Sequence, residues 1–169
     1  MARIFLIGYM GSGKTTFGKV LSKALGYEFI DMDVYIEEQQ FKSISQIFEE
    51  QGEDAFRILE QKCLKELGTF ENVVIATGGG APCFFDNMEF MNTHGITAYL
   101  KLSTNEIINR LESSKKNKRP LIANLTKEEL HQFITNALTT REPFYTKAHL
   151  SVSGTDEEII AKISKKISQ

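Results

Sequence analysis

The sequence predicts an α/β fold built on a mainly parallel sheet. Short apolar runs rich in β-branched and aromatic residues alternate with longer segments in which apolar residues recur at helical spacing. Such an alternation places parallel strands in one sheet and joins them by right-handed crossovers. The length of 169 residues corresponds to one domain. We therefore expect residues 1–169 to form a single α/β domain.

Five apolar segments are predicted strands: residues 3–7, 27–30, 73–76, 97–102 and 148–152. Helices are predicted from the spacing of apolar residues and from capping and stop signals. They begin at residue 14, after Asp33, at residue 43 with a break at Gly52, at residue 84, after Ser103, at residue 126 and after Thr155. The helix at residue 84 is expected to end at 92, and the helix at 126 near 140, just before Pro143.

A glycine-rich turn separates the first strand from the first helix. Residues 8–15 read G-Y-M-G-S-G-K-T and satisfy the phosphate-loop pattern G-x-x-x-x-G-K-[ST] in its strand-loop-helix context. Glycines let backbone N–H groups approach phosphate oxygens, and the helix that follows adds its positive N-terminal dipole. Lys14 would reach the β- and γ-phosphates, and Thr15 would offer a hydroxyl to Mg²⁺. This segment predicts a nucleotide site, and an incidental glycine turn is the alternative.

Polar residues follow the second and third predicted strands. Asp31 and Asp33 come after one, and residues 77–80, reading T-G-G-G, come after the other. Ligands of open α/β sheets bind outside the carboxyl ends of the strands, so these groups are expected on the rim that holds the phosphate loop. Either aspartate can also cap the next helix, and the glycines can form a flexible turn.

Two further polar features are open to more than one interpretation. Arg57 and Glu60 are three residues apart on a predicted helix, and spacing alone favours an exposed surface pair. Residues 112–121 form the most polar stretch, with Lys115, Lys116 and Lys118 among its cations. A stretch of this kind is usually a solvated loop, but in a phosphate-handling protein it can act as a lid.

Composition narrows the function classes. The net charge of −2 argues against binding a nucleic-acid polymer. The chain has no apolar stretch near the length of a membrane span and no secretory leader, so we expect a cytoplasmic protein without a membrane partner. Cys63 and Cys83 are expected to be reduced thiols, and the three histidines have no metal-ligand spacing. A monomer is the default expectation, because no long heptad pattern is present.

Six motifs stand in one order along the chain. They are the phosphate loop at 8–16, D-x-D at 31–33, F-R-x-x-E at 56–60, T-G-G-G at 77–80, R-P-L at 119–121 and R-x-x-x-Y at 141–145. Together they resemble the shikimate kinases. The resemblance implies a three-layer α/β/α P-loop kinase fold with a five-stranded parallel sheet in the order 2-3-1-4-5. It also implies a substrate-binding helical segment at about residues 32–61 and a mobile lid at about 112–124.

The resemblance implies an activity and a set of site residues. Shikimate kinases transfer phosphate from ATP to the 3-hydroxyl of shikimate, a step toward chorismate and the aromatic amino acids. By position, catalytic roles fall to Lys14, Asp33 and Arg119. The implied nucleotide-binding residues are Gly11, Ser12, Gly13, Lys14, Thr15, Thr16, Arg110 and Arg119. The implied shikimate-binding residues are Asp33, Arg57, Gly79 and Arg141, with Glu60 holding Arg57. Mg²⁺ is implied at Thr15, with Asp31 acting through water.

The acceptor chemistry fits these residue types. Shikimate is an anionic triol, so its site needs cations for the carboxylate and an acceptor for hydroxyl groups. The guanidinium groups of Arg57 and Arg141 offer paired N–H donors for a carboxylate. A kinase for gluconate or for nucleoside monophosphates is the alternative enzyme, and a non-enzymatic nucleotide-binding module is the alternative outside catalysis.

Overall fold

The computed structural model describes residues 2–113, 122 and 124–169. Its centre is one parallel sheet of five strands, β1 (Arg3–Ile7), β2 (Glu28–Asp31), β3 (Val73–Ala76), β4 (Ile96–Leu100) and β5 (Leu150–Val152). The strand order is β2-β3-β1-β4-β5. Residues 3–6 of β1 pair with residues 73–76 of β3, and residues 4–7 pair with residues 96–99 of β4. The predicted α/β class, parallel pairing and order 2-3-1-4-5 are therefore confirmed.

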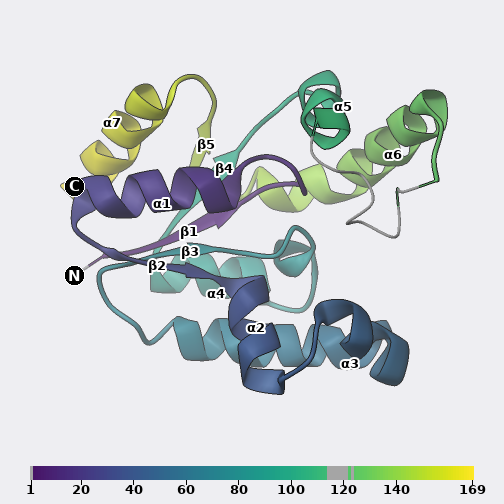
Figure 1. The fold of residues 1–169 in the computed structure, drawn as a ribbon. Helices are drawn as coiled ribbons and strands as arrows, with labels where there is room; N and C mark the ends of the chain where they lie inside the picture. Colours follow the sequence, from purple (N-terminus) through teal and green to yellow (C-terminus); the bar gives the residue numbers. More distant parts are fainter. Residues whose placement is uncertain (1, 114–121, 123) are drawn as a thin grey trace.

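Helices cover both faces of the sheet (Figure 1). They are α1 (Lys14–Leu25), α2 (Met32–Gln40), α3 (Ile44–Leu67), α4 (Asn87–His94), α5 (Thr104–Ser113), α6 (Lys127–Tyr145) and α7 (Asp156–Ile167), with a 3₁₀ turn η1 at Ala81–Cys83. Each described helix is too short or too polar to cross a membrane.

The apolar core has two parts, one on each face of the sheet. Helices α1 and α7 pack on one face, and side chains of α2 to α6 pack on the other. Strand β1 contributes to both, because alternate side chains of a strand point to opposite faces. Ile4 and Leu6 belong to the cluster under α1 and α7, whereas Phe5 and Ile7 belong to the larger cluster. This sandwich is the predicted three-layer arrangement, and it fixes the end of β1 from which the phosphate loop starts.

Several element boundaries differ from the sequence prediction. The helix expected from residue 84 begins only at Asn87, as α4, and Phe85 lies between it and η1 with a positive φ of 49°. Helix α6 continues past the predicted end near residue 140, through Pro143 to Tyr145. Pro143 removes one helical N–H, but only two residues of the helix follow it, so the helix ends soon after the proline. The fourth strand begins at Ile96, one residue early, and ends at Leu100. Strand β5 begins at Leu150, two residues later than predicted.

The break expected at Gly52 is confirmed. This residue interrupts α3 with φ 82° and ψ 173°, values outside the helical region. The second part of α3 can therefore take its own direction toward the sheet, and it carries Arg57 and Glu60. Most of the predicted lid, including Arg119, lies outside the described residues.

Candidate active site

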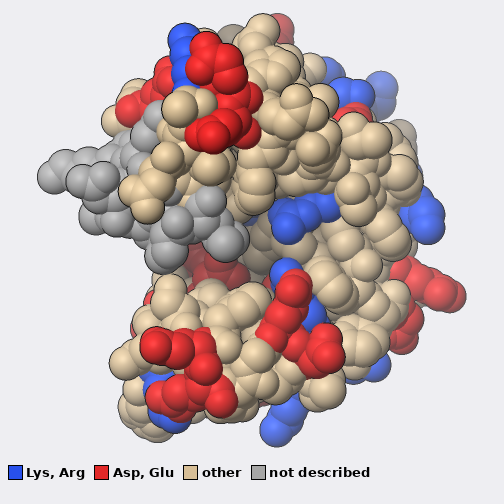
Figure 2. All heavy atoms as spheres, turned by 90° about the vertical axis from the view of Figure 1, so that its right-hand side faces the viewer, with Lys and Arg blue, Asp and Glu red and all other residues tan. Residues whose placement is uncertain are grey.

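The phosphate loop, the aspartates after β2 and the glycines after β3 lie at the same edge of the sheet, where these strands end. This edge is on the right in Figure 1, near α5 and α6. Figure 2 shows that face in space-filling form, with a hollow near its middle, basic atoms along the hollow and acidic atoms on its lower side. The candidate active site is therefore at the carboxyl ends of the strands, as the sequence predicts.

The loop between β1 and α1 has the backbone of a phosphate cradle. Gly8, Gly11 and Gly13 have φ values of 148°, 78° and 90°, which only glycine adopts readily. Gly13 precedes α1, and no side chain caps the helix, so its first N–H groups face the loop. The Nζ of Lys14 donates to the carbonyls of Gly8 (2.7 Å) and Tyr9 (3.1 Å). Its ammonium group is thereby held over the loop, where a phosphate would lie.

Ser12 and Arg110 form the side of the loop that faces α5. The Oγ of Ser12 is buried and has no hydrogen-bond partner. The Nη1 of Arg110 donates to the carbonyl of Ser12 at 3.1 Å, and a Cβ added to Gly13 would lie 2.8 Å from the same Nη1. A buried hydroxyl without a partner and a close approach that only glycine permits both fit a loop shaped around a ligand.

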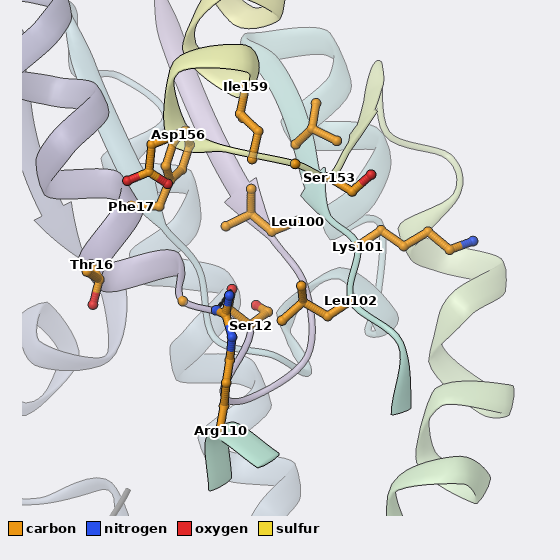
Figure 3. Close-up of a pocket in the computed structure, with 13 residues that line it drawn as sticks. Ser12, Thr16, Phe17, Leu100, Lys101, Leu102, Arg110, Ser153, Asp156 and Ile159 are labelled. Carbon is orange, nitrogen blue, oxygen red and sulfur yellow. Dashed lines mark hydrogen bonds between the residues drawn. The ribbon is translucent and has the colours of Figure 1, made fainter. Parts of the chain in front are cut away.

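A pocket of about 240 Å³ lies beside this loop. Figure 3 shows Arg110 and Ser12 at one end of it, and Ser153, Asp156 and Ile159 near the start of α7 at the other. The remaining lining residues include Thr16, Phe17, Leu100, Lys101 and Leu102. The combination of apolar side chains and a guanidinium group suits a flat aromatic group attached to the phosphates.

Thr15 and Asp31 are in direct contact. The Oγ1 of Thr15 donates to Oδ2 of Asp31 at 2.6 Å. The other carboxylate oxygen of Asp31 caps α2 by accepting from the N–H groups of Asp33 (3.1 Å) and Val34 (3.4 Å). Asp31 therefore serves as both helix cap and site residue, and the two predictions for it are compatible. Its contact brings together the two oxygen donors predicted to serve Mg²⁺.

Asp33 stands on the first turn of α2, between the loop and Arg57. Burial raises the pKa of the Asp33 carboxyl, and the neighbouring negative charge of Asp31 raises it further. The positive charges of Lys14 and Arg57 act in the opposite direction, but they do not cancel the rise. A raised pKa makes this carboxylate a stronger base than an exposed aspartate.

Arg57 and Glu60 form a buried ion pair. The Nη1 of Arg57 donates to Oε2 of Glu60 at 2.9 Å, and Glu60 is only 1% exposed. Burial raises the pKa of Glu60, whereas the charge and hydrogen bond of Arg57 lower it. The pair is thus in contact, as the resemblance implies. Spacing alone favoured an exposed pair, which is wrong.

The guanidinium group of Arg57 is held from three sides. Besides Glu60, its Nε and Nη2 donate to Oε1 of Glu53, at 3.3 and 3.2 Å. Its central carbon lies 4.1 Å from the centroid of the Phe84 ring. Glu53 is more than half exposed. It occupies the paired Nε and Nη2 donors, so a ligand carboxylate that binds this edge of the guanidinium group would take the place of Glu53.

The triple-glycine loop, residues 78–80, lies at the centre of these side chains. A Cβ at Gly78 would lie 2.8 Å from Oε1 of Glu60 and 3.0 Å from Oδ1 of Asp33. A Cβ at Gly80 would lie 2.7 Å from Nη1 of Arg57. The contacts of 2.8 Å at Gly78 and 2.7 Å at Gly80 are too short for a Cβ unless the facing side chains shift, so close approach accounts for these two glycines.

Arg141 completes the group from α6. A Cβ at Gly79 would lie 3.5 Å from Nη1 of Arg141, and the guanidinium carbon lies 5.3 Å from the centroid of the Tyr9 ring. The structure thus brings together two arginines, the carboxylate of Asp33 and a strip of bare backbone, next to the phosphate loop. Such a site suits an anionic acceptor with hydroxyl groups.

Comparison with known proteins identifies the family. The sequence model of the family described as "Shikimate kinase" matches residues 10–169. The chain belongs to the shikimate kinase family. A shikimate kinase from Parabacteroides distasonis is 56% identical over 151 residues, which cover 89% of this chain and 87% of the relative. The predicted resemblance is confirmed, and members of this family are ATP-dependent kinases.

Solved structures of the family have the same fold. A shikimate kinase from Bacteroides thetaiotaomicron superimposes with a TM-score of 0.93 at 43% identity, covering 99% of each chain. A shikimate kinase from Acinetobacter baumannii, solved in complex with shikimate, gives 0.87 at 35% identity and covers 99% of this chain and 93% of its own. A gluconokinase from Sinorhizobium meliloti gives 0.58 at 16% identity, which shows a shared fold alone. The P-loop kinase fold that we predicted is thereby confirmed.

Sequence reasoning assigned no role to several residues of the site. Glu53 and Phe84 hold Arg57, and Tyr145 donates a hydrogen bond to the carbonyl of Gly79 at 2.5 Å. The spacing of Glu53, four residues before Arg57, was a usable signal, and so was that of Tyr145, four residues after Arg141. Nothing local could indicate Phe84, because it meets Arg57 only through the tertiary fold.

Proposed function

We propose that this chain transfers the γ-phosphate of ATP to the 3-hydroxyl of shikimate, giving shikimate 3-phosphate and ADP. The observation that carries the proposal is the grouping of Arg57, Arg141 and Asp33 around the triple-glycine loop, beside a phosphate loop. The relative from Acinetobacter baumannii that binds shikimate in its solved structure supports the choice of acceptor.

On the acceptor side, Arg57 and Arg141 bind the carboxylate of shikimate. Glu60 holds Arg57 in place through the buried ion pair, and the backbone of Gly79 contacts a ring hydroxyl. Asp33 orients the 3-hydroxyl and accepts its proton as the oxygen attacks the γ-phosphorus. A bond forms between that oxygen and phosphorus, and the bond from phosphorus to the β-bridging oxygen breaks, so that ADP leaves.

On the nucleotide side, the loop residues Gly11, Ser12, Gly13, Lys14, Thr15 and Thr16 bind the phosphates of ATP. Lys14 neutralises charge on the β- and γ-phosphates and follows the transferred group. Arg110 lies against adenine in the pocket of Figure 3. Arg119, which is outside the described residues, is expected to cover the phosphates as part of the lid at about 112–124.

Mg²⁺ is the proposed metal. The hydroxyl of Thr15 and the carboxylate of Asp31 are the hard oxygen donors that this ion prefers, and they are already adjacent at 2.6 Å. Across the described part of the chain, no group of three acidic, histidine or cysteine side chains forms a metal site of its own. A site with few protein ligands fits Mg²⁺ that is shared with ATP phosphates and water, where it neutralises phosphate charge.

We also propose that residues 1–169 form one domain that acts as a monomer in the cytoplasm, with no nucleic-acid or membrane partner. Within it, we assign the substrate-binding segment to about residues 32–61. Size-exclusion chromatography with light scattering tests the monomer, and cell fractionation tests the location. A stable dimer at micromolar concentration contradicts the first of these.

The decisive experiment is an ADP-release assay with Mg²⁺ and ATP. Shikimate, gluconate and nucleoside monophosphates are offered in parallel as acceptors. We expect turnover with shikimate and only background release with the others, since the described residues at the site group two cations with a carboxylate and include none assigned to a base edge. Turnover on another acceptor with none on shikimate would refute the proposal and support the alternative kinase. ATP binding without turnover on any acceptor would support a non-enzymatic nucleotide-binding module.

A further inference from the structure

The carbonyl groups of the triple-glycine loop are all engaged, and the loop itself supplies two of the donors. The N–H of Ala81 donates to the carbonyl of Gly78 at 3.1 Å, and the N–H of Cys83 donates to the carbonyl of Gly80 at 2.9 Å. These two bonds close successive turns that lead into η1. They leave the carbonyls of Gly79 and Ala81 without a backbone donor.

Two buried side chains from elsewhere in the fold supply the missing donors. The hydroxyl of Tyr145 donates to the carbonyl of Gly79 at 2.5 Å, and Nδ2 of Asn87 donates to the carbonyl of Ala81 at 2.9 Å. Both residues are fully buried. Four consecutive carbonyls are thereby held, two by the loop and two by side chains of α6 and α4.

The N–H groups of the same glycines are in a different situation. Among the described residues, the N–H groups of Gly78, Gly79 and Gly80 donate to no acceptor. The described peptide bonds are all trans, so the N–H of each peptide points away from its C=O. Because the carbonyl of Gly79 is directed to Tyr145, the N–H of Gly80 is directed to the opposite side of the loop. The loop thus presents backbone donors and no acceptors.

This orientation is not fixed by the glycines themselves. A peptide between two glycines can rotate at little steric cost, because neither neighbour has a Cβ. Rotation of the Gly79–Gly80 peptide would replace an N–H donor by a carbonyl oxygen, which repels a carboxylate and can no longer donate to the lone pairs of a hydroxyl group. The hydrogen bond to Tyr145 is the one described contact that opposes this rotation at the carbonyl of Gly79.

Tyr145 is itself held firmly. Its ring packs on that of Tyr99, with 5.0 Å between the centroids, and its hydroxyl also interacts with the side chain of Arg141, one turn earlier on α6. Burial raises the pKa of the Tyr145 hydroxyl far above its usual value, so the group keeps its proton and remains a donor. Asn87 is similarly dedicated to the loop, because its Oδ1 has no partner and its only described side-chain hydrogen bond goes to Ala81.

We propose that Tyr145 is a positioning residue for the acceptor, whose hydroxyl fixes the Gly79–Gly80 peptide so that the loop offers N–H donors to the oxygen atoms of shikimate. Asn87 likewise fixes the loop by donating to the carbonyl of Ala81, which has no donor from the loop backbone. The inference rests on the proposed function, because it requires that the acceptor binds beside this loop.

The test is Tyr145→Phe, which removes the hydroxyl and keeps the ring. We expect KM for shikimate to rise about three- to tenfold, the effect of losing one neutral hydrogen bond, while KM for ATP stays within about twofold of wild type. Tyr99→Phe is the matched control, since it removes a hydroxyl from the other ring of the tilted pair, and no described hydrogen bond joins that hydroxyl to the loop. This control should leave KM for shikimate unchanged, and thermal unfolding of both variants reports any loss of stability.

Asn87→Leu provides a second, independent variant of similar volume. It should also raise KM for shikimate more than KM for ATP, because it leaves the carbonyl of Ala81 without its donor. If Tyr145→Phe raises KM for shikimate by no more than about twofold, or if the KM values for both substrates rise in parallel, the positioning role of Tyr145 is overturned, and the same result in Asn87→Leu overturns the role of Asn87. Absence of shikimate turnover in the wild-type protein instead overturns the proposed function, and this inference with it.

Discussion

The role of Arg57 can be separated from its structural contribution by replacing it with lysine. Arg57→Lys keeps a positive charge beside the buried carboxylate of Glu60, so the ion pair is not left as an isolated buried charge. A lysine ammonium is a single point donor, and it cannot contact Glu60 and also present two parallel donors to a ligand carboxylate. The variant should therefore fold and bind shikimate poorly.

The magnitude follows from the contacts. Loss of one charge-assisted hydrogen bond costs about 1.5–3 kcal/mol, which corresponds to a rise in KM for shikimate of about 10- to 150-fold. Arg57→Ala would in addition leave Glu60 buried and unpaired, at a cost of about 3–5 kcal/mol in the free energy of unfolding. For a chain of 169 residues, that loss lowers Tm by about 6–20 °C, whereas Arg57→Lys should lower it far less.

The measurements are KM for shikimate at saturating ATP and Tm by thermal unfolding. Lys42→Ala is the control for a broken surface pair, because Lys42 pairs with Glu50 and both side chains are solvent-exposed. This control should change Tm only slightly and leave KM unchanged. A KM for shikimate within about twofold of wild type in Arg57→Lys, with normal Tm, would show that Arg57 does not hold the acceptor carboxylate.

Four further predictions concern the other groups of the site. Asp33→Asn should lower kcat by about 10²- to 10⁴-fold with nearly unchanged ATP affinity, and near-normal turnover would exclude Asp33 as the base. The same variant should have a higher Tm than wild type at pH 7–8, measured by thermal unfolding across pH. Burial raises the pKa of Asp33, so the folded state favours the neutral carboxyl. The stabilisation of the folded state by the neutral carboxyl is complete below the unfolded pKa of about 4. It is lost as the pH rises through the folded pKa, where Asp33 becomes charged. The Tm gap should therefore close as pH falls toward 4, and a gap independent of pH would contradict the assigned cause. Arg110→Ala should raise KM for ATP about three- to tenfold at constant KM for shikimate, and an equal rise for both substrates would contradict its place in the nucleotide pocket. Thr15→Val should increase the Mg²⁺ concentration for half-maximal rate about tenfold, and an unchanged Mg²⁺ requirement would remove Thr15 from the metal site.

Features encoded locally were predictable from the sequence. The strands β1 and β3 are short runs of buried apolar residues, and the phosphate loop is defined by consecutive residues with strict backbone needs. The helix starts predicted at Thr126 and Thr155 are confirmed, because both threonines form capping boxes with a glutamate three residues later. Each of these signals is complete within a few residues, so tertiary context could not reverse it.

Features that depend on distant residues were not predictable in the same way. Arg57 and Glu60 have the same spacing in an exposed pair as in a buried one, and packing against Phe84 and the triple-glycine loop decides which occurs. The bond from Tyr145 to Gly79 spans 66 residues of sequence. The motif R-x-x-x-Y marks Tyr145 in the sequence, but no pattern along the chain indicates that its hydroxyl meets the carbonyl of Gly79.

The alternation of β1 between two cores has a consequence for how this chain can change in length. Ile4 and Leu6 pack under α1 and α7, and Phe5 and Ile7 pack on the opposite face. Inserting or deleting one residue within β1 would point the side chains beyond the change to the opposite face of the sheet. It would also shift the start of the phosphate loop by one residue along the strand. The turn between α2 and α3 carries no such constraint, since Phe41 there is 94% exposed. We therefore expect the protein to tolerate insertions at that turn, whereas an insertion among the five residues before Gly8 should prevent correct folding.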